Sequence, residues 1–190
     1  MGEPSKIDHL IKTVKEVQTP KTEEEKFKKL LQSKEKVTKL HFFLQDALGG
    51  GSNDTVWEVA RAQITPNSTT SFGQVRVLDD LITAQPDRNS EKLGRAQGMI
   101  TSSGLDESAL TMNLNFYFTS GEYKGSTLCV VGRNPISSKN RELPVVGGTG
   151  VFRMARGYTI SNTYSYDAVE NYGVLEYTVY VAYLDVEDQL

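Results

Sequence analysis

The sequence lacks the residues from which metal centres and covalent cross-links are usually built. Its 190 residues include one cysteine and two histidines, His9 and His41, which stand far apart. An intrachain disulfide is therefore impossible, and histidine cannot supply the three convergent ligands of a catalytic metal site. The sequence also has no nucleophile elbow, phosphate-binding loop or dinucleotide fingerprint. We expect neither a metal nor a cofactor.

Long apolar runs and an excess of one charge are absent as well. No stretch of about 18 apolar residues occurs, so no segment predicts a membrane-spanning helix. The net charge is −3, and the basic residues near the start of the chain are mixed with acidic ones. A nucleic-acid-binding face needs clustered lysine and arginine. The composition therefore favours a single domain with neither a membrane nor a nucleic acid as partner, and 38% hydrophobic residues is enough to close one core.

The single cysteine, Cys129, stands between Leu128 and Val130 in an apolar stretch. No histidine or helix N-terminus stands beside it in the sequence to activate the thiol. We expect an inert, buried side chain.

The hydrophobic period changes at about residue 37. Before this point, apolar residues recur at helical spacing, and Thr22 with Glu25 forms a capping-box pattern. We therefore predict a helical or mobile N-terminal extension at residues 1–37 and a main domain at residues 38–190. The two helices expected in the extension are residues 7–17 and 22–31.

From residue 38 onward, apolar and polar residues alternate, which is typical of strands buried on one face. About eight such runs are separated by clusters of glycine, asparagine, aspartate and serine. An antiparallel set of this size usually closes, since closure removes exposed edges, and its interior is filled or holds one small ligand. The predicted fold class is all-β, an eight-stranded antiparallel β-barrel with a short N-terminal helical extension. The runs include residues 40–45, 57–62, 110–119 and 172–186.

One stretch combines turn residues, strand residues and arginines at high density. Arg141–Val146 predicts a short extended run, and Gly147–Gly150 supplies backbone positions that are free to adopt positive φ. Val151–Ile160 resumes an extended pattern. We therefore expect a strand, a tight corner and a second strand.

The same stretch resembles the signature of the plant dirigent family. The resemblance rests on the turn GRNP at 132–135, the pair Arg141-Glu142, PVVGGTG at 144–150 and FRMARGY at 152–158. Residues 72–83 and GRAQG at 94–98 match the same family, so the resemblance covers residues 38–184. It implies an eight-stranded barrel with an open mouth, a homotrimer, and a cavity for a small hydrophobic phenolic ligand.

The resemblance also implies site residues. Asp46 stands where the family carries a pocket acid, and Arg141 matches an arginine that points into the same cavity, so both are candidate catalytic residues. From the residues alone, Asp46 could instead be a turn residue ahead of the glycine loop. Asn134 stands where lignan-directing members tend to have aspartate, and an amide can orient a ligand oxygen but cannot deliver a proton at neutral pH. Ile100 and Ser102 lie where the family often has aromatic residues, so we expect them, with Asn134, to contact the substrate.

Other polar residues have structural interpretations. We expect Asp79-Asp80 to cap a turn between strands. Arginines at 95, 133, 153 and 156 are expected to pair with these aspartates and with Glu142. Tyrosines crowd the last third of the chain, where they favour strand packing, an oligomer interface or a stacking platform for a sugar or a phenol.

The expected function is to impart stereoselectivity in phenylpropanoid or related plant metabolism, by positioning phenoxy radicals or quinone-methide intermediates. Radical coupling requires an external oxidase. One alternative is an isoflavanol dehydratase similar to the pterocarpan-forming members, and a second is a non-catalytic defence or carbohydrate-binding module. The extension has no continuous apolar stretch of a secretory signal, which favours the cytoplasm, with export to the apoplast, usual in the family, as the alternative.

Overall fold

The computed structural model describes residues 22–48 and 51–185. Its contacts divide the chain into two compact units, one that contains the helix and one that spans Lys34–Asp185. The helix, α2 (Glu23–Leu31), begins with the predicted capping box: Glu25 N–H donates to Thr22 Oγ1, and Thr22 N–H donates to Glu25 Oε2, both at 3.1 Å. The other predicted helix, at residues 7–17, lies outside the described residues.

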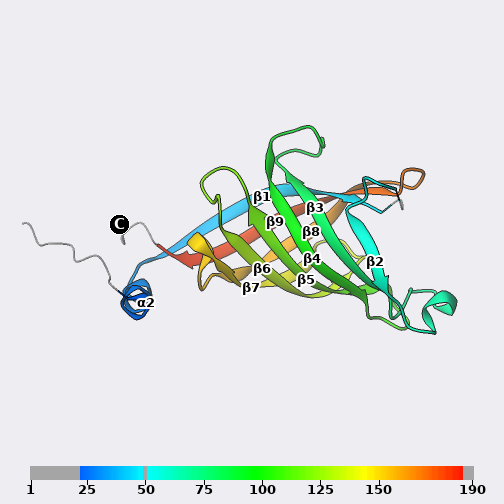
Figure 1. Cartoon of the computed structure of the whole chain (residues 1–190), viewed down its shortest axis with the longest axis horizontal. Helices are drawn as coiled ribbons and strands as arrows, with labels where there is room; N and C mark the ends of the chain where they lie inside the picture. Colours follow the sequence, from blue (N-terminus) through cyan, green and yellow to red (C-terminus); the bar gives the residue numbers. More distant parts are fainter. Residues whose placement is uncertain (1–21, 49–50, 186–190) are drawn as a thin grey trace, which may run out of the picture. The chain divides into compact units, whose positions relative to one another are not determined.

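The main unit is an antiparallel barrel (Figure 1). Its strands follow one another in space in the order β1-β9-β8-β7-β6-β5-β4-β3, and a β1–β3 pairing closes the ring. The eight-stranded antiparallel barrel predicted from the alternation is confirmed, and a ninth strand, β2, pairs with the part of β3 that β1 does not reach. The strands are β1 (Glu35–Ala47), β2 (Val56–Ala60), β3 (Val75–Thr83), β4 (Lys92–Ser102), β5 (Ala109–Phe118), β6 (Thr127–Pro135), β7 (Arg141–Thr149), β8 (Arg156–Asp167) and β9 (Tyr172–Leu184).

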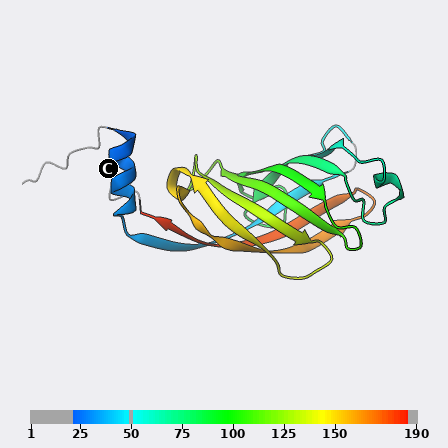
Figure 2. The same cartoon turned by 90° about the horizontal axis from the view of Figure 1, so that it is seen from below.

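Alternate residues of each strand point into the barrel and form its core. In β5, Leu110, Met112, Leu114, Phe116 and Phe118 are all buried, as their spacing predicts. At one end, aromatic rings fill the interior: Phe152 contacts Tyr123 with ring centroids 4.8 Å apart and Tyr183 at 5.4 Å. The short helical turn η2 (Gly150–Phe152) lies at this filled end, opposite to β2 and η1 (Thr65–Asn67) (Figures 1 and 2).

The corner between β7 and β8 differs from the prediction. β7 continues to Thr149, since Gly147 and Gly148 remain paired with β6. The chain turns at residues 150–155 instead, with Gly150 at a φ of +61° and Met154 at +61°. The strand expected from Val151 therefore begins only at Arg156, because Phe152 turns inward and is fully buried.

Three further details correct the sequence analysis. β1 begins at Glu35, and its first residues therefore belong to the barrel rather than to the extension to which the sequence analysis assigned them. The strand expected at 57–62 ends at Ala60. β9 ends at Leu184, and Val186 lies outside the described residues. Cys129 is half-buried rather than buried, because its neighbours Leu128 and Val130 point inward and direct its thiol outward, within 3.2 Å of Asn115 Oδ1.

Candidate functional site

The barrel holds a cavity of about 870 Å³, and all nine strands contribute residues to its wall. Most of the wall is apolar, with Leu44, Leu78, Ile100, Leu110, Met112, Leu114 and Leu175 among its residues. Its polar residues include two groups: Asp46, Asp80 and Arg76 come from β1 and β3, and Asn134 and Arg141 come from β6 and β7. β1 and β3 are neighbours, β6 and β7 are neighbours, and the two pairs face each other across the ring. The cavity therefore carries these two polar groups on opposite walls, with apolar residues between them.

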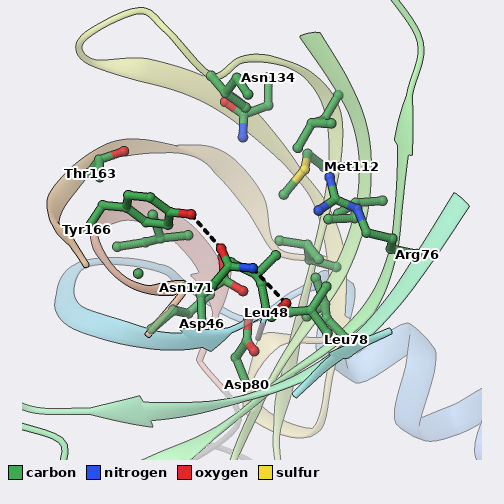
Figure 3. A pocket seen from close by; sticks show the side chains of 18 of the residues that line it. Asp46, Leu48, Arg76, Leu78, Asp80, Met112, Asn134, Thr163, Tyr166 and Asn171 are labelled. Carbon is green, nitrogen blue, oxygen red and sulfur yellow. Dashed lines mark hydrogen bonds between the residues drawn. The ribbon is translucent and has the colours of Figure 1, made fainter. Parts of the chain in front are cut away.

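The first polar group is a pair of carboxyls. β1 and β3 pair as Leu44↔Ile82 and Gln45↔Leu81, so Asp46 and Asp80 occupy the next position of the register. Both side chains point to the cavity, where they lie close together in Figure 3. Alternation explains this placement, since Asp46 shares the inward face of β1 with Leu44, and Asp80 shares the inward face of β3 with Ile82.

Both carboxyls hold protons more strongly than in water. Burial raises the pKa of Asp46 to about 6, and the guanidinium of Arg76 opposes this shift. Burial also raises the pKa of Asp80 well above its usual range, and the neighbouring charge of Asp46 raises it further. Oδ1 of Asp46 is buried and accepts no hydrogen bond from the protein. The pair therefore holds a proton near neutral pH and has an oxygen left for a ligand.

The second polar group combines an amide with a guanidinium. Arg141 is buried, and its Nη1 donates to the carbonyls of Ile136 and Ser138 at 3.3 and 3.2 Å. Its Nε and Oδ1 of Asn134 are buried without a hydrogen-bond partner in the protein. Unpaired buried polar atoms are costly, so both atoms suit a polar ligand group. In Figure 3, Asn134 lies on the opposite side of the cavity from Asp46 and Asp80.

A fully buried tyrosine lies at the inner part of the cavity wall. Burial raises the pKa of Tyr177 to about 12, whereas Arg141 and a hydrogen bond with Ser161 oppose the shift. Its ring stacks with Phe42, with centroids 6.0 Å apart. The phenol is therefore held neutral and rigid beside the Arg141 guanidinium.

At the mouth, the β8–β9 hairpin is tied to the chain that follows β1. The hydroxyl of Tyr166 donates to Asn171 Oδ1 at 2.5 Å, and Asn171 Nδ2 donates to the Leu48 carbonyl at 2.8 Å (Figure 3). All three residues line the cavity. This chain of hydrogen bonds shapes one side of the opening.

The sequence matches the family model described as "Dirigent-like protein" over residues 37–182. It is 44% identical to Dirigent protein 1 of Arabidopsis thaliana over 147 residues, which are 77% of this chain and 79% of the relative. The chain belongs to the dirigent family. It is also 40% identical to Pterocarpan synthase 1 of Glycine max, over 77% of this chain and 79% of that protein. The solved structure of the pterocarpan synthase dirigent protein GePTS1 aligns with a TM-score of 0.75 and 37% identity, over 80% of this chain and 93% of that one.

This dirigent barrel brings together four of the five residues predicted for the site. Asp46, Arg141, Asn134 and Ile100 line the cavity. Asp46 lies in β1, which excludes the alternative that it is only a turn residue. Ser102 is buried on the inward side of β4, but it lies outside the cavity wall, at the end of the strand. The roles assigned to these residues stay predictions.

Sequence analysis missed Asp80 and Arg76. Asp79-Asp80 forms no turn, because both residues lie within β3, where Asp79 faces outward and Asp80 inward. The alternation of Arg76, Leu78, Asp80 and Ile82 is the signal that could have placed both residues on the inner face. Arg76 is the cation that opposes the raised pKa of Asp46.

The expected ion pairs are found in part. Nε of Arg95 lies 2.7 Å from Asp79 Oδ1, as predicted, on the outer surface. Arg133 and Arg156 pair with Glu107 and Glu35 instead of the expected partners. The tyrosines also divide: Tyr166 and Tyr177 line the cavity, whereas those at 158 and 180 contact each other elsewhere with centroids 5.1 Å apart. They form no single stacking platform.

In the part of the chain that the structure describes, no helix is long and apolar enough to cross a membrane. Over residues 22–48 and 51–185, no cluster of three or more histidine, cysteine, aspartate or glutamate side chains is arranged to hold a metal ion.

Proposed function

We propose that this dirigent protein binds a phenolic substrate in the barrel and directs the stereochemistry of a step that passes through a quinone methide. The observation that carries the proposal is the buried carboxyl pair Asp46–Asp80, placed across an apolar cavity from Arg141 and Asn134. A general acid works best with a pKa near the operating pH, which burial provides here. The family resemblance to pterocarpan synthases supports the same chemistry.

The acid step follows from the carboxyl pair. A proton from the pair passes to a benzylic hydroxyl of the substrate, the carbon–oxygen bond breaks, and water leaves. A phenol of the same molecule gives up its proton to water, which leaves a neutral quinone methide. A second phenol then attacks the methide carbon, and its proton returns to the pair. Water returns a proton to the quinone-methide oxygen, which restores the aromatic ring. The net change is the loss of one water molecule.

The opposite wall holds the other end of the substrate. The Arg141 guanidinium suits the oxygen on which negative charge develops when the first phenol loses its proton, and the unpartnered Oδ1 of Asn134 suits a hydroxyl of the substrate. The apolar residues between the two walls, such as Ile100 and Met112, suit aromatic rings. Fixing both ends of the molecule presents one face of the methide carbon to the attacking phenol, and this selects one enantiomer.

A second candidate function uses the same cavity without the acid. In this case an external oxidase forms phenoxy radicals from coniferyl alcohol, and the barrel only positions them. Asn134 favours neither radical coupling nor dehydration, since an amide can bind a phenol oxygen in both. A carbohydrate-binding module is less well supported, because Asp46 and Arg141 line a cavity inside the barrel rather than an open face.

Substitution of the acid pair tests the proposal. Asp46→Asn and Asp80→Asn each keep the shape of the side chain but remove an ionisable group. With an isoflavanol as substrate, we expect each variant to lose about 10²- to 10⁴-fold in the rate of dehydration, while ligand affinity changes little. Asp79→Asn is the matched control, since Asp79 neighbours Asp80 on β3 but faces outward. Products are separated on a chiral column.

The outcomes separate the candidate functions. Loss of dehydration in the Asp46 and Asp80 variants, with the Asp79 variant active, supports the acid pair. Stereoselective coupling of coniferyl alcohol with an added oxidase, unaffected by Asp46→Asn, supports positioning alone. If the unaltered protein neither dehydrates an isoflavanol nor makes coupling selective, the proposal is wrong.

A further inference from the structure

Thr55 lies at the point where β1 and β3 separate. Direct pairing of these strands is last seen at Gln45↔Leu81. Beyond it, Thr55 takes the place of the missing partner for both strands: its N–H donates to the Ala47 carbonyl at 3.0 Å, and its carbonyl accepts from Asp79 N–H at 2.9 Å. The backbone of Thr55 is therefore held from two sides, directly beside the carboxyl pair.

The hydroxyl of Thr55 both accepts and donates a hydrogen bond. It accepts a hydrogen bond from Ala47 N–H at 3.0 Å, and it donates to Oδ1 of Asp80 at 2.5 Å. A hydroxyl has one proton and two acceptor lone pairs, and the Ala47 amide occupies one of the lone pairs, so it restricts the directions in which that proton can point. In the structure the proton points to Oδ1 of Asp80, which accepts this bond.

We propose that Thr55 is a positioning residue for the carboxyl pair: it orients the Asp80 carboxyl and keeps Oδ1 an acceptor, so that a proton on Asp80 is carried on Oδ2. The inference rests on the proposed function, in which the pair is the acid of the reaction. Thr55 touches no reacting atom in this role and acts only through Asp80.

The electrostatic effect of the bond has a definite sign. A hydrogen bond donated to a carboxylate stabilises the charged form, so Thr55 lowers the pKa of Asp80 and opposes the increase caused by burial and by Asp46. Arg95 also lowers this pKa, and Asp79 raises it. The titratable and charged groups around the pair, from all elements packed against it, are Asp54, Arg76, Asp79, Arg95, Tyr172 and Tyr177.

Two variants of Thr55 separate the hydroxyl from the shape of the side chain. Thr55→Val keeps the branched shape and removes the hydroxyl, whereas Thr55→Ser keeps the hydroxyl. Side-chain carboxyl carbons of aspartate are followed by carbon-13 NMR from pH 3 to 9, and Asp80→Asn assigns the resonance. We expect Thr55→Val to move the Asp80 titration midpoint upward by at least about half a pH unit, and Thr55→Ser to leave it in place.

The unaltered protein gives a second measurement that requires no variant. The Thr55 hydroxyl proton, held by the carboxylate, should exchange slowly with water and give its own proton resonance, which shifts as Asp80 titrates. A hydroxyl proton that exchanges as fast as that of free threonine overturns the proposal. An unchanged Asp80 midpoint in a folded Thr55→Val variant overturns it as well.

Neither NMR measurement uses a substrate, so the positioning role and the proposed function can fail separately. With an isoflavanol substrate, Thr55→Val should also move the basic limb of the pH–rate profile upward, in step with the NMR midpoint. A shifted midpoint in a protein that has no dehydrating activity upholds the role of Thr55 and contradicts the proposed function. Activity whose pH profile is the same in Thr55→Val and Thr55→Ser upholds the proposed function and contradicts the role of Thr55.

Discussion

At the scale of single residues, the buried carboxyl of Asp46 makes stability depend on pH. Its pKa is 3.8 before burial and about 6 in the folded protein. Between these values the folded state binds more protons than the unfolded state, so stability falls as pH rises through this window. We therefore expect Asp46→Asn to raise the free energy of unfolding at pH 7 by about 2–3 kcal/mol, and to have little effect near pH 3.5.

Urea unfolding of both proteins between pH 3.5 and 8 measures this difference. Asp79→Asn is again the control, because it removes an outward carboxylate that is paired with Arg95, and it should give no gain at pH 7. An Asp46→Asn variant that is no more stable than the parent at pH 7 would show that burial of this charge costs the fold nothing. A gain would mean that the site retains the carboxyl at the expense of stability.

Whether a site residue could be predicted from the sequence depended on whether its signal is local. Asp46 and Arg141 were found by family resemblance, and Ile100 also follows from the inward alternation of its strand. Asp80 was missed because an Asp-Asp pair also suits a turn, and only the register of β1 against β3 brings it opposite Asp46. The contact of Thr55 with Asp80 joins residues 25 positions apart, and no local pattern indicates it.

At the scale of elements, the turn after β7 depends on one glycine. Gly150 has a φ of +61°, and a Cβ there would lie 2.5 Å from Ser126 Oγ, which accepts the Val151 N–H. We expect Gly150→Ala to destabilise the barrel by about 2–4 kcal/mol, through both the left-handed backbone and the clash. Gly121→Ala is the matched control, since its φ of +69° is similar but no atom lies within 4 Å, and about 1 kcal/mol is expected.

Chemical denaturation of the two variants, compared at one pH, measures both costs. Equal losses would show that Ser126 moves aside without cost and that only the backbone conformation matters. The sequence predicted that Gly147–Gly150 make a corner, but the chain turns only at residues 150–155. Glycine composition alone could not show that Gly147 and Gly148 stay in the ladder with β6, because pairing between strands decides this.

Element boundaries show the same limit at the start of the barrel. The capping box of α2 is a local pattern, and it was predicted correctly. The start of β1 at Glu35 is not local, since Glu35 pairs with Leu184 and Lys36 with Tyr183 at the far end of the sequence. The division of the chain into an extension and a barrel domain stays a prediction, as does its location in the cell.

At the scale of the whole molecule, alternation was sufficient to predict closure of the barrel. Eight runs with one apolar face each need a common interior, and an antiparallel ring supplies it without exposed edges. Alternation could not show which strands close the ring, nor that β2 pairs with only one part of β3. The cavity volume was also beyond prediction, because it depends on how far the aromatic cluster around Phe152 fills the other end.

The last prediction is that the protein is a homotrimer, which requires an interface on the outer surface of the barrel. The family resemblance implies the trimer but names no interface, and β9 is a poor candidate, because Glu176 lies on its outer face and pairs with His41 at 2.8 Å. A better candidate is an outer row across β2–β6, where residues pair as Trp57↔Val77↔Met99↔Asn113↔Val131. The four apolar members are 50%, 41%, 44% and 38% exposed, in chain order. Contiguous exposed apolar rows are typical of interfaces.

Light scattering at micromolar concentration should therefore give about three times the mass of the 21.1 kDa chain. Met99→Lys combined with Val131→Lys places two charges in the row and should shift the mass toward that of one chain, because charge is depleted from interface cores. Val169→Lys, at a side chain that is 91% exposed and outside the row, should leave the assembly intact. A single-chain mass for the unaltered protein contradicts the trimer. A trimer that survives the double substitution places the interface on another face of the barrel.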